Sequence, residues 1–204
     1  MNFSNLPLSR RQSSLVLLLF ALSLLLFILE NVNGDSITQA LFYQRDLISE
    51  GELWRIFTGH LLHTNGFHLS LNLAALTLLW ALHGQFYNLK NYSCVFLSCA
   101  VSTSLGIYFF NPALLQYVGL SGVLHGIFIF GALMDIFNND KTGYLLFIGV
   151  WLKIAHEQLY GASADVSSLI EANVAVDAHL WGAIGGLLFS IVYLLKIKKT
   201  SGFG

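Results

Sequence analysis

Long apolar stretches divided by short polar segments are the feature that most limits how this chain can fold. A helix that crosses a bilayer needs about 20 largely apolar residues. The chain contains six such stretches, at residues 13–29, 67–83, 93–110, 118–137, 143–160 and 174–195. Only 10% of the residues are charged, whereas a soluble domain carries about 25%. We therefore expect an all-α, polytopic membrane protein with six transmembrane helices, in a single domain over residues 1–204.

The first and fifth stretches are the least typical of membrane spans. The first follows Arg10 and Arg11 as the core of a signal peptide would, but no small-residue cleavage site comes after it. We therefore expect a helix that is retained in the protein. The fifth contains Lys153, His156 and Glu157, which are costly groups in hydrocarbon.

Positive charges indicate how the helices are oriented. Six spans place both termini on one side of the membrane, and the opposite side then receives only Arg45 and Arg55. The side of the termini receives Arg10, Arg11, Lys90, Lys141, Lys196, Lys198 and Lys199. Because Lys and Arg concentrate in cytoplasmic segments, both termini are expected in the cytoplasm. The second, fourth and sixth helices then begin at the outer face.

The outer segment at residues 30–65 is too long for a simple connection, so we expect it to have structure of its own. Residues 53–57 within it are amphipathic, and Trp54 and Arg55 are expected to anchor them at the membrane interface. Cys94 and Cys99 share one apolar stretch but not one helix face. We expect them to pack as apolar side chains rather than to form a disulfide.

Ser121 is a candidate nucleophile. It lies in Gly119-Leu120-Ser121-Gly122, at the start of the fourth stretch. The glycines leave room for a peptide backbone to approach, and free N–H groups at a helix start can stabilise an oxyanion. The alternative interpretation is a serine that caps or packs a helix.

His179 is a candidate base, because an ionisable side chain inside a membrane helix is a functional candidate by default. Gly182 and Gly186 follow it on the same helix face, and Gly122 and Gly126 form a matching stripe on the fourth helix. Small residues at this spacing allow helices to pack closely, which an imidazole needs in order to reach a serine oxygen. A histidine bonded to a backbone carbonyl is the alternative.

His68 and Asn72 are four residues apart and share a face of the second helix. Both can donate hydrogen bonds, so they suit an oxyanion hole completed by the Ser121 backbone N–H. A polar pair that joins two helices is the alternative. These groups and His179 all lie near the outer ends of their helices, at one depth. Asp177 faces away from His179, so we expect a Ser-His dyad without an acidic third member.

Several further groups have open roles. His125 lies one turn beyond Ser121 and either binds substrate or water or is structural. Lys153 and Glu157 form an ion pair or contact substrate. Candidates for contact with substrate or for support of the site also include His63, Gly119 and Gly122. A metal at His60, His63 and His68 is not expected, because neither a carboxylate nor a His-Glu-x-x-His motif joins them. No other cofactor is expected.

In this order, the motifs resemble those of the rhomboid family of intramembrane serine proteases. They are Trp54-Arg55, His63, His68-x3-Asn72, Gly119-x-Ser121-Gly122 and Ala178-His179-x2-Gly182-x3-Gly186. The resemblance covers residues 13–195. It implies that Ser121 is the nucleophile, that His179 is the general base and that His68 and Asn72 donate to the oxyanion. It also implies that the partners are transmembrane protein substrates.

A closer resemblance is to the rhombosortase branch, in the stretches 58–65, 119–126 and 176–180. It implies an enzyme of the bacterial inner membrane with its active site open to the periplasm. Its substrates would carry C-terminal anchor tails built from a Gly-Gly motif, a transmembrane helix and a basic cluster. The partners expected are these proteins and membrane lipid, without nucleic acid. A non-catalytic rhomboid-like protein that binds clients, or a histidine-lined transporter, is the alternative.

Overall fold

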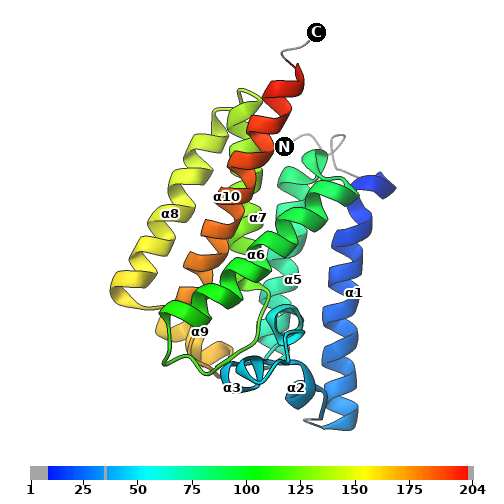
Figure 1. Ribbon diagram of the computed structural model, residues 1–204, viewed down its shortest axis with the longest axis vertical. Helices are drawn as coiled ribbons and strands as arrows, with labels where there is room; N and C mark the ends of the chain where they lie inside the picture. Colours follow the sequence, from blue (N-terminus) through cyan, green and yellow to red (C-terminus); the bar gives the residue numbers. More distant parts are fainter. Residues whose placement is uncertain (1–8, 35, 202–204) are drawn as a thin grey trace.

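The computed structural model describes residues 9–34 and 36–201, and long helices run side by side through it (Figure 1). The long helices are α1 (Arg10–Asn33), α5 (Gly66–His83), α6 (Leu89–Phe110), α7 (Ser121–Phe137), α8 (Thr142–Tyr160) and α10 (Val176–Ser201). Each overlaps one of the six apolar stretches. The start of α1 and the end of α10 lie at the same end of the bundle, which an even number of crossings requires.

Four of these helices are long and apolar enough to cross a membrane. Their apolar segments are Gln12–Val32, Gly66–Phe86, Leu89–Phe110 and Val176–Lys199. The apolar helix α7 has 17 residues, and α8 carries the charged side chains of Lys153 and Glu157. The protein is therefore a mostly helical, multi-pass membrane protein.

Short elements lie at the other end of the bundle, where α2, α3 and α9 are seen in Figure 1. Between α1 and α5 they are α2 (Ser36–Leu41), β1 (Tyr43–Gln44), α3 (Arg45–Ser49), α4 (Arg55–Thr58) and η2 (Gly59–Leu61). The others are β2 (Gln116–Tyr117) and α9 (Ala164–Leu169), whereas η3 (Gly84–Phe86) follows α5 at the end of the bundle where α1 begins. β1 and β2 pair antiparallel, with Tyr43 opposite Tyr117, so the first outer segment is tied to the chain just before α7.

Arg55 is buried, and this corrects the expectation that it anchors the protein at the membrane interface. Only 3% of the residue is exposed. Its guanidinium donates to the backbone oxygens of Phe42 and Gln39 at 2.8 and 2.9 Å and to Glu52 Oε2 at 2.6 Å. Arg55 therefore holds the outer segment together from inside. Trp54 remains half exposed and keeps the position expected of an interfacial side chain.

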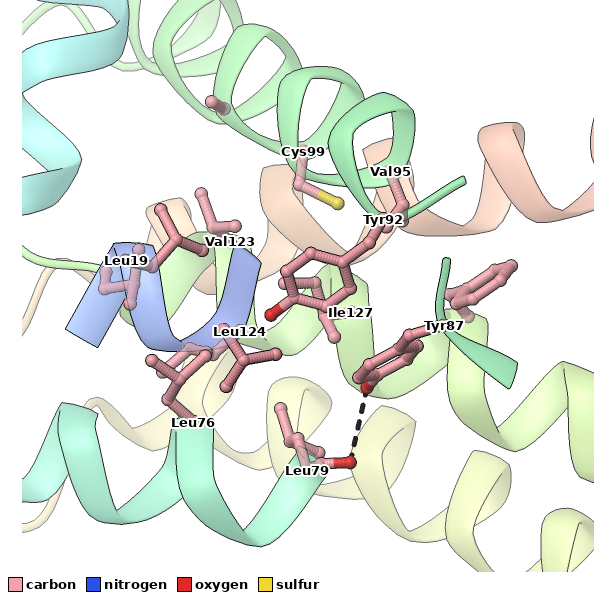
Figure 2. Packing of buried hydrophobic residues seen from close by; sticks show 14 of the residues in the cluster. Leu19, Leu76, Leu79, Tyr87, Tyr92, Val95, Cys99, Val123, Leu124 and Ile127 are labelled. Atoms are coloured by element: carbon pink, nitrogen blue, oxygen red, sulfur yellow. Dashed lines mark hydrogen bonds between the residues drawn. The ribbon is translucent and has the colours of Figure 1, made fainter. Parts of the chain in front are cut away.

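The largest apolar cluster fills the space between α1, α5, α6 and α7 (Figure 2). Leu19, Leu76 and Ile127 contribute from three of these helices, and the Tyr87 hydroxyl donates to the Leu79 oxygen at 3.3 Å. Cys99 packs within the cluster as a fully buried free thiol, whereas Cys94 is an exposed one. The two cysteines therefore form no disulfide, as expected.

Glycine allows α7 and α10 to approach closely, as the matching stripes in the sequence indicated. A Cβ added at Gly182 would lie 1.9 Å from the Gly122 oxygen, and one at Gly186 would lie 2.1 Å from the Gly126 oxygen. Neither position can hold a larger residue without moving a backbone. This contact sets the spacing of the two helices that carry Ser121 and His179.

Large apolar side chains cover much of the outer surface of the long helices. Examples are Leu17, Leu25, Leu145, Leu152 and Val192, each at least half exposed. A soluble monomer rarely exposes so many such residues, and hydrocarbon is the solvent in which they are stable. The bundle is therefore surrounded by lipid.

Candidate active site

Ser121 and His179 are joined by a hydrogen bond between α7 and α10. Ser121 is the first residue of α7, and His179 lies in the first turn of α10. The distance from Ser121 Oγ to His179 Nε2 is 3.0 Å, within the reach that a serine and its base need. His179 is buried and Ser121 is partly exposed, so the hydroxyl is open to an approaching chain.

Gly119 turns the chain into α7 and lies against His68. Its φ of +126° is in a region that only glycine adopts easily. A Cβ at this position would lie 2.8 Å from His68 Nε2 and 4.0 Å from Asn72 Nδ2. Gly119, two residues before Ser121, therefore brings the segment of the candidate nucleophile beside both predicted oxyanion donors.

The orientation of the His68 ring is set by the chain before α5. His68 Nδ1 lies 3.1 Å from Thr64 Oγ1 and 3.4 Å from the Thr64 backbone nitrogen, so its other ring nitrogen, Nε2, faces Gly119. One amide proton of Asn72 goes to the His68 oxygen at 3.2 Å, and an amide nitrogen has a second proton to donate. Both side chains thus place a nitrogen near the segment of Ser121, and that of Asn72 has a proton to donate.

His125 lies flat against His179. The ring centroids are 4.1 Å apart and the planes differ by 19°. His125 Nδ1–H donates to the Ser121 backbone oxygen at 2.7 Å, so its ring is locked to α7. These contacts are those of a structural side chain packed on the His179 ring, and contact of His125 with substrate stays a prediction.

Glu157 accepts a hydrogen bond from His179, and this corrects the expectation that no acidic residue lies beside that histidine. His179 Nδ1–H donates to Glu157 Oε2 at 2.9 Å. Lys153 Nζ donates to the other carboxylate oxygen at 2.6 Å, so the ion pair, one of the two interpretations of these residues, is present, and contact with substrate stays a prediction. Glu157 lies on the same face of α8 as the buried Val150 and Ile154. Its spacing of seven and three residues from them indicated that face, but not the contact with His179.

A cavity of about 440 Å³ opens beside Ser121 at the end of the bundle that carries the short elements. Its lining includes Ser121, His68, His63, Tyr117 and Ile170. His63 is 4% exposed, lies edge-on to His68 and has no hydrogen-bond partner on either ring nitrogen. Burial and the neighbouring His68 lower the pKa of His63 to about 3, so His63 faces the cavity as a neutral ring.

His60, His63 and His68 are not arranged as a metal site. His60 is fully buried, and its Nε2–H donates towards α6, 3.2 Å from the Ala100 oxygen. A different trio, His125, Glu157 and His179, brings ligand atoms within 4.8 Å of one another. However, the lone pairs of the stacked rings lie in two nearly parallel planes about a ring's thickness apart, and both nitrogens of His179 already have partners.

Comparison with known proteins gives the family. Residues 50–196 match the rhomboid domain, which is more than half of the chain. The chain belongs to the rhomboid family. Rhomboid proteases are intramembrane serine endopeptidases that act on transmembrane proteins, and the matched region contains each site residue described above.

Two rhomboid proteins of Bacillus subtilis (strain 168) are similar to the chain. Rhomboid protease GluP is 28% identical over 192 residues, which are 92% of this chain and 36% of GluP. YdcA, named as a candidate rhomboid protease, is 27% identical over 155 residues, which are 74% of this chain and 73% of YdcA. The chain thus spans about a third of the length of GluP.

Proposed function

We propose that this rhomboid protein is an active intramembrane serine endopeptidase that cleaves membrane-anchored proteins near the outer face of the membrane. The observation that carries the proposal is the 3.0 Å hydrogen bond between Ser121 Oγ and His179 Nε2, beside a cavity that reaches Ser121. A helix-capping serine has no need of a buried imidazole as its partner.

In the proposed reaction, Ser121 Oγ attacks the scissile carbonyl carbon while its proton moves to His179 Nε2. The carbonyl oxygen becomes an oxyanion, which His68, Asn72 and the Ser121 backbone N–H stabilise. When the C–N bond breaks, the imidazolium donates its proton to the leaving amine. Water then hydrolyses the acyl-enzyme in the same way. This chemistry requires no cofactor.

We propose six membrane crossings, with α7 and α8 completing the four apolar helices, in a single domain in the bacterial inner membrane. The Lys and Arg excess at the end of the bundle where α10 finishes supports a cytoplasmic location for both termini. The termini themselves, residues 1–8 and 202–204, lie outside the described residues. In this orientation, the cavity beside Ser121 opens to the periplasm.

The proposed substrates are surface-destined or secreted proteins with rhombosortase-type C-terminal anchor tails. A substrate must leave its helix before its carbonyl can be attacked, and glycine destabilises a helix by about 1 kcal/mol relative to alanine. A Gly-Gly step just outside the membrane span of a client satisfies this condition. The space beside Gly119 and Gly122 of the protease is filled by its own packing, against His68 and against Ala178 and Thr103.

The test combines labelling with analysis of a client protein. Wild-type protein should react with a fluorophosphonate probe, and Ser121→Ala should not. Co-expression with a reporter that carries a Gly-Gly anchor tail should release a product whose new C-terminus, located by mass spectrometry, lies at the glycines. A tail with both glycines replaced by leucine should be cleaved poorly.

The contrary results are equally specific. A folded, membrane-inserted wild type that binds the reporter but neither labels nor cleaves it would identify a client-binding protein without catalysis. A cut in the cytoplasmic half of the span would exclude the proposed depth of the site. Full cleavage of the leucine variant would exclude the proposed Gly-Gly preference while leaving the protease assignment intact.

A further inference from the structure

Glu157 has two partners, and each uses a different carboxylate oxygen. Oε2 accepts from His179 Nδ1–H at 2.9 Å, and Oε1 accepts from Lys153 Nζ at 2.6 Å. The side chains of Glu157 and His179 are 12% and 6% exposed, whereas that of Lys153 is 50% exposed. Lys153 therefore contacts the Glu157 carboxylate from the exposed side, and His179 contacts it from the buried side.

The position of Glu157 is determined by the packing of α8. Ile154, three residues earlier, belongs to a buried cluster with Val150, Ile129 and Ala183, which joins α8 to α7 and α10. This cluster lies one turn from the carboxylate and holds its helix against the helix of His179. A buried ion pair is weak evidence of stabilisation, because desolvation offsets much of its attraction. The geometry therefore has to be explained by what the carboxylate does to His179.

The contact determines which nitrogen of His179 carries the proton. An ionised carboxylate can only accept hydrogen bonds, so Nδ1 is protonated and Nε2 has a free lone pair. That lone pair faces Ser121 Oγ at 3.0 Å. The other groups that face His179 are the stacked ring of His125 and, on α5, His68. Neither of these two bonds to Nδ1, so Glu157 decides the tautomer.

We propose that Glu157 is a positioning residue that completes a Ser121–His179–Glu157 unit, an inference that rests on the proposed function. It holds the imidazole in the tautomer that can accept the Ser121 proton. When that proton reaches Nε2, the positive charge of the imidazolium lies beside the carboxylate and is stabilised by it. The carboxylate itself takes up no proton. Lys153 lies on the exposed side of Glu157 and donates to the carboxylate oxygen that His179 does not use.

The test measures the fluorophosphonate labelling rate of Ser121, together with kcat and KM for a membrane-anchored reporter, in the full-length protein. Glu157→Gln keeps the shape of the side chain, but its amide can donate to Nδ1 and favour the wrong tautomer. Labelling and kcat should fall by about 10²–10⁴-fold, with KM within about two-fold of wild type. Glu157→Asp, which restores the carboxylate, should recover part of the rate.

Lys153→Gln is the matched control, because it removes the same ion pair from the other side. It should lower the labelling rate by less than about ten-fold, because Lys153 is half exposed and the Glu157–His179 hydrogen bond remains. The double variant Lys153→Gln/Glu157→Gln removes both charges of the pair, so neither is left without its partner. It should be as slow as Glu157→Gln. It also carries the test if Glu157→Gln alone does not fold.

Two results would overturn the inference while leaving the proposed function in place. One is a Glu157→Gln protein, or a folded double variant, that labels within about three-fold of wild type. The other is an equal loss in Lys153→Gln and Glu157→Gln, which would mean that Glu157 acts through Lys153 alone. Failure of the proposed function would look different, because the wild type would then show no labelling that depends on Ser121.

Discussion

His125 lies flat on His179, with ring centroids 4.1 Å apart and an angle of 19° between the planes. Because His125 is itself bonded to the Ser121 backbone oxygen, the nucleophile's own helix limits the movement of the base. The His179 ring is thus held on its face by His125 and at its edge by the hydrogen bond to Ser121 Oγ. A ring of any aromatic type at this position can supply the stacking surface.

We predict that His125→Ala lowers kcat more than His125→Phe does. An aromatic pair contributes about 0.5–1.5 kcal/mol beyond its buried area, so losing the stack should reduce kcat by about 2- to 12-fold. His125→Phe keeps a flat ring and should retain more activity. Steady-state cleavage of a reporter checks both variants. Equal activity in the two would show that the stack has no role.

Ser121→Ala and His179→Ala should each abolish cleavage while leaving insertion unchanged. A nucleophile and its base act as a unit, so losses on the order of 10⁶-fold are expected and should not add. The double variant should be no slower than either single one. Rates from long incubations, with membrane insertion measured in parallel, provide the check. Substantial cleavage by Ser121→Ala would disprove the assignment.

His68→Ala and Asn72→Ala should slow cleavage without weakening substrate binding. One lost oxyanion donor typically costs about 10²–10³-fold in kcat, and KM should change little. Asn91→Ala is the control. Asn91 is a buried amide near the start of α6, at the end of the bundle away from Ser121, and it donates to the Phe86 backbone oxygen and to the Tyr193 hydroxyl. This substitution should lower the unfolding temperature but not kcat. If all three variants only unfold earlier, His68 and Asn72 serve to join helices.

Gly182→Ala should damage both stability and activity. The added Cβ would lie 1.9 Å from the Gly122 oxygen, so α7 and α10 must move apart, and the free energy of unfolding should fall by about 1–3 kcal/mol. The Ser121–His179 bond should lengthen in the same movement. Gly149→Ala on α8 is the control, since its Cβ would meet nothing within 4 Å. It should be neutral or slightly stabilising.

Acid should destabilise the folded protein through the buried histidines of the outer segment. Burial lowers the pKa of His60 and His63 from 6.5 to about 4 and about 3. Both values lie below the pKa of 6.5 that a histidine has in the unfolded chain. The contribution of these neutral histidines to the free energy of unfolding is therefore fully present above pH 6.5 and is lost as the pH falls towards their folded-state pKa values. At pH 5 the loss should be about 2 kcal/mol for each histidine.

The check for this prediction is thermal unfolding in detergent at pH 7.5 and pH 5. A His63→Leu variant removes one of the two titrations, so the pH-dependent loss should be about 2 kcal/mol smaller than in wild type. An identical loss in the two proteins would show that His63 is protonated in the folded state.

Local sequence determined the helices and much of the candidate site. Apolar length predicted each long helix, because backbone groups in lipid must bond within their own segment. Ser121 and His179 were recognisable because a serine between glycines and an ionisable ring are unusual at membrane depth. The glycine stripes indicated which helices meet, since only small residues allow the approach now measured at Gly182.

The partners of Glu157 and Arg55 were decided by the tertiary structure alone. Lys153 and Glu157 form a pair that is complete within one helix, so nothing local required Glu157 to bond His179 as well. Arg55 likewise bonds the backbone oxygens of Phe42 and Gln39 in its own loop, which no periodic pattern predicts. Helix formation depends on neighbours in the chain. The rotation and depth of one helix against another depend on packing summed over many residues, and that packing sets which polar atoms meet.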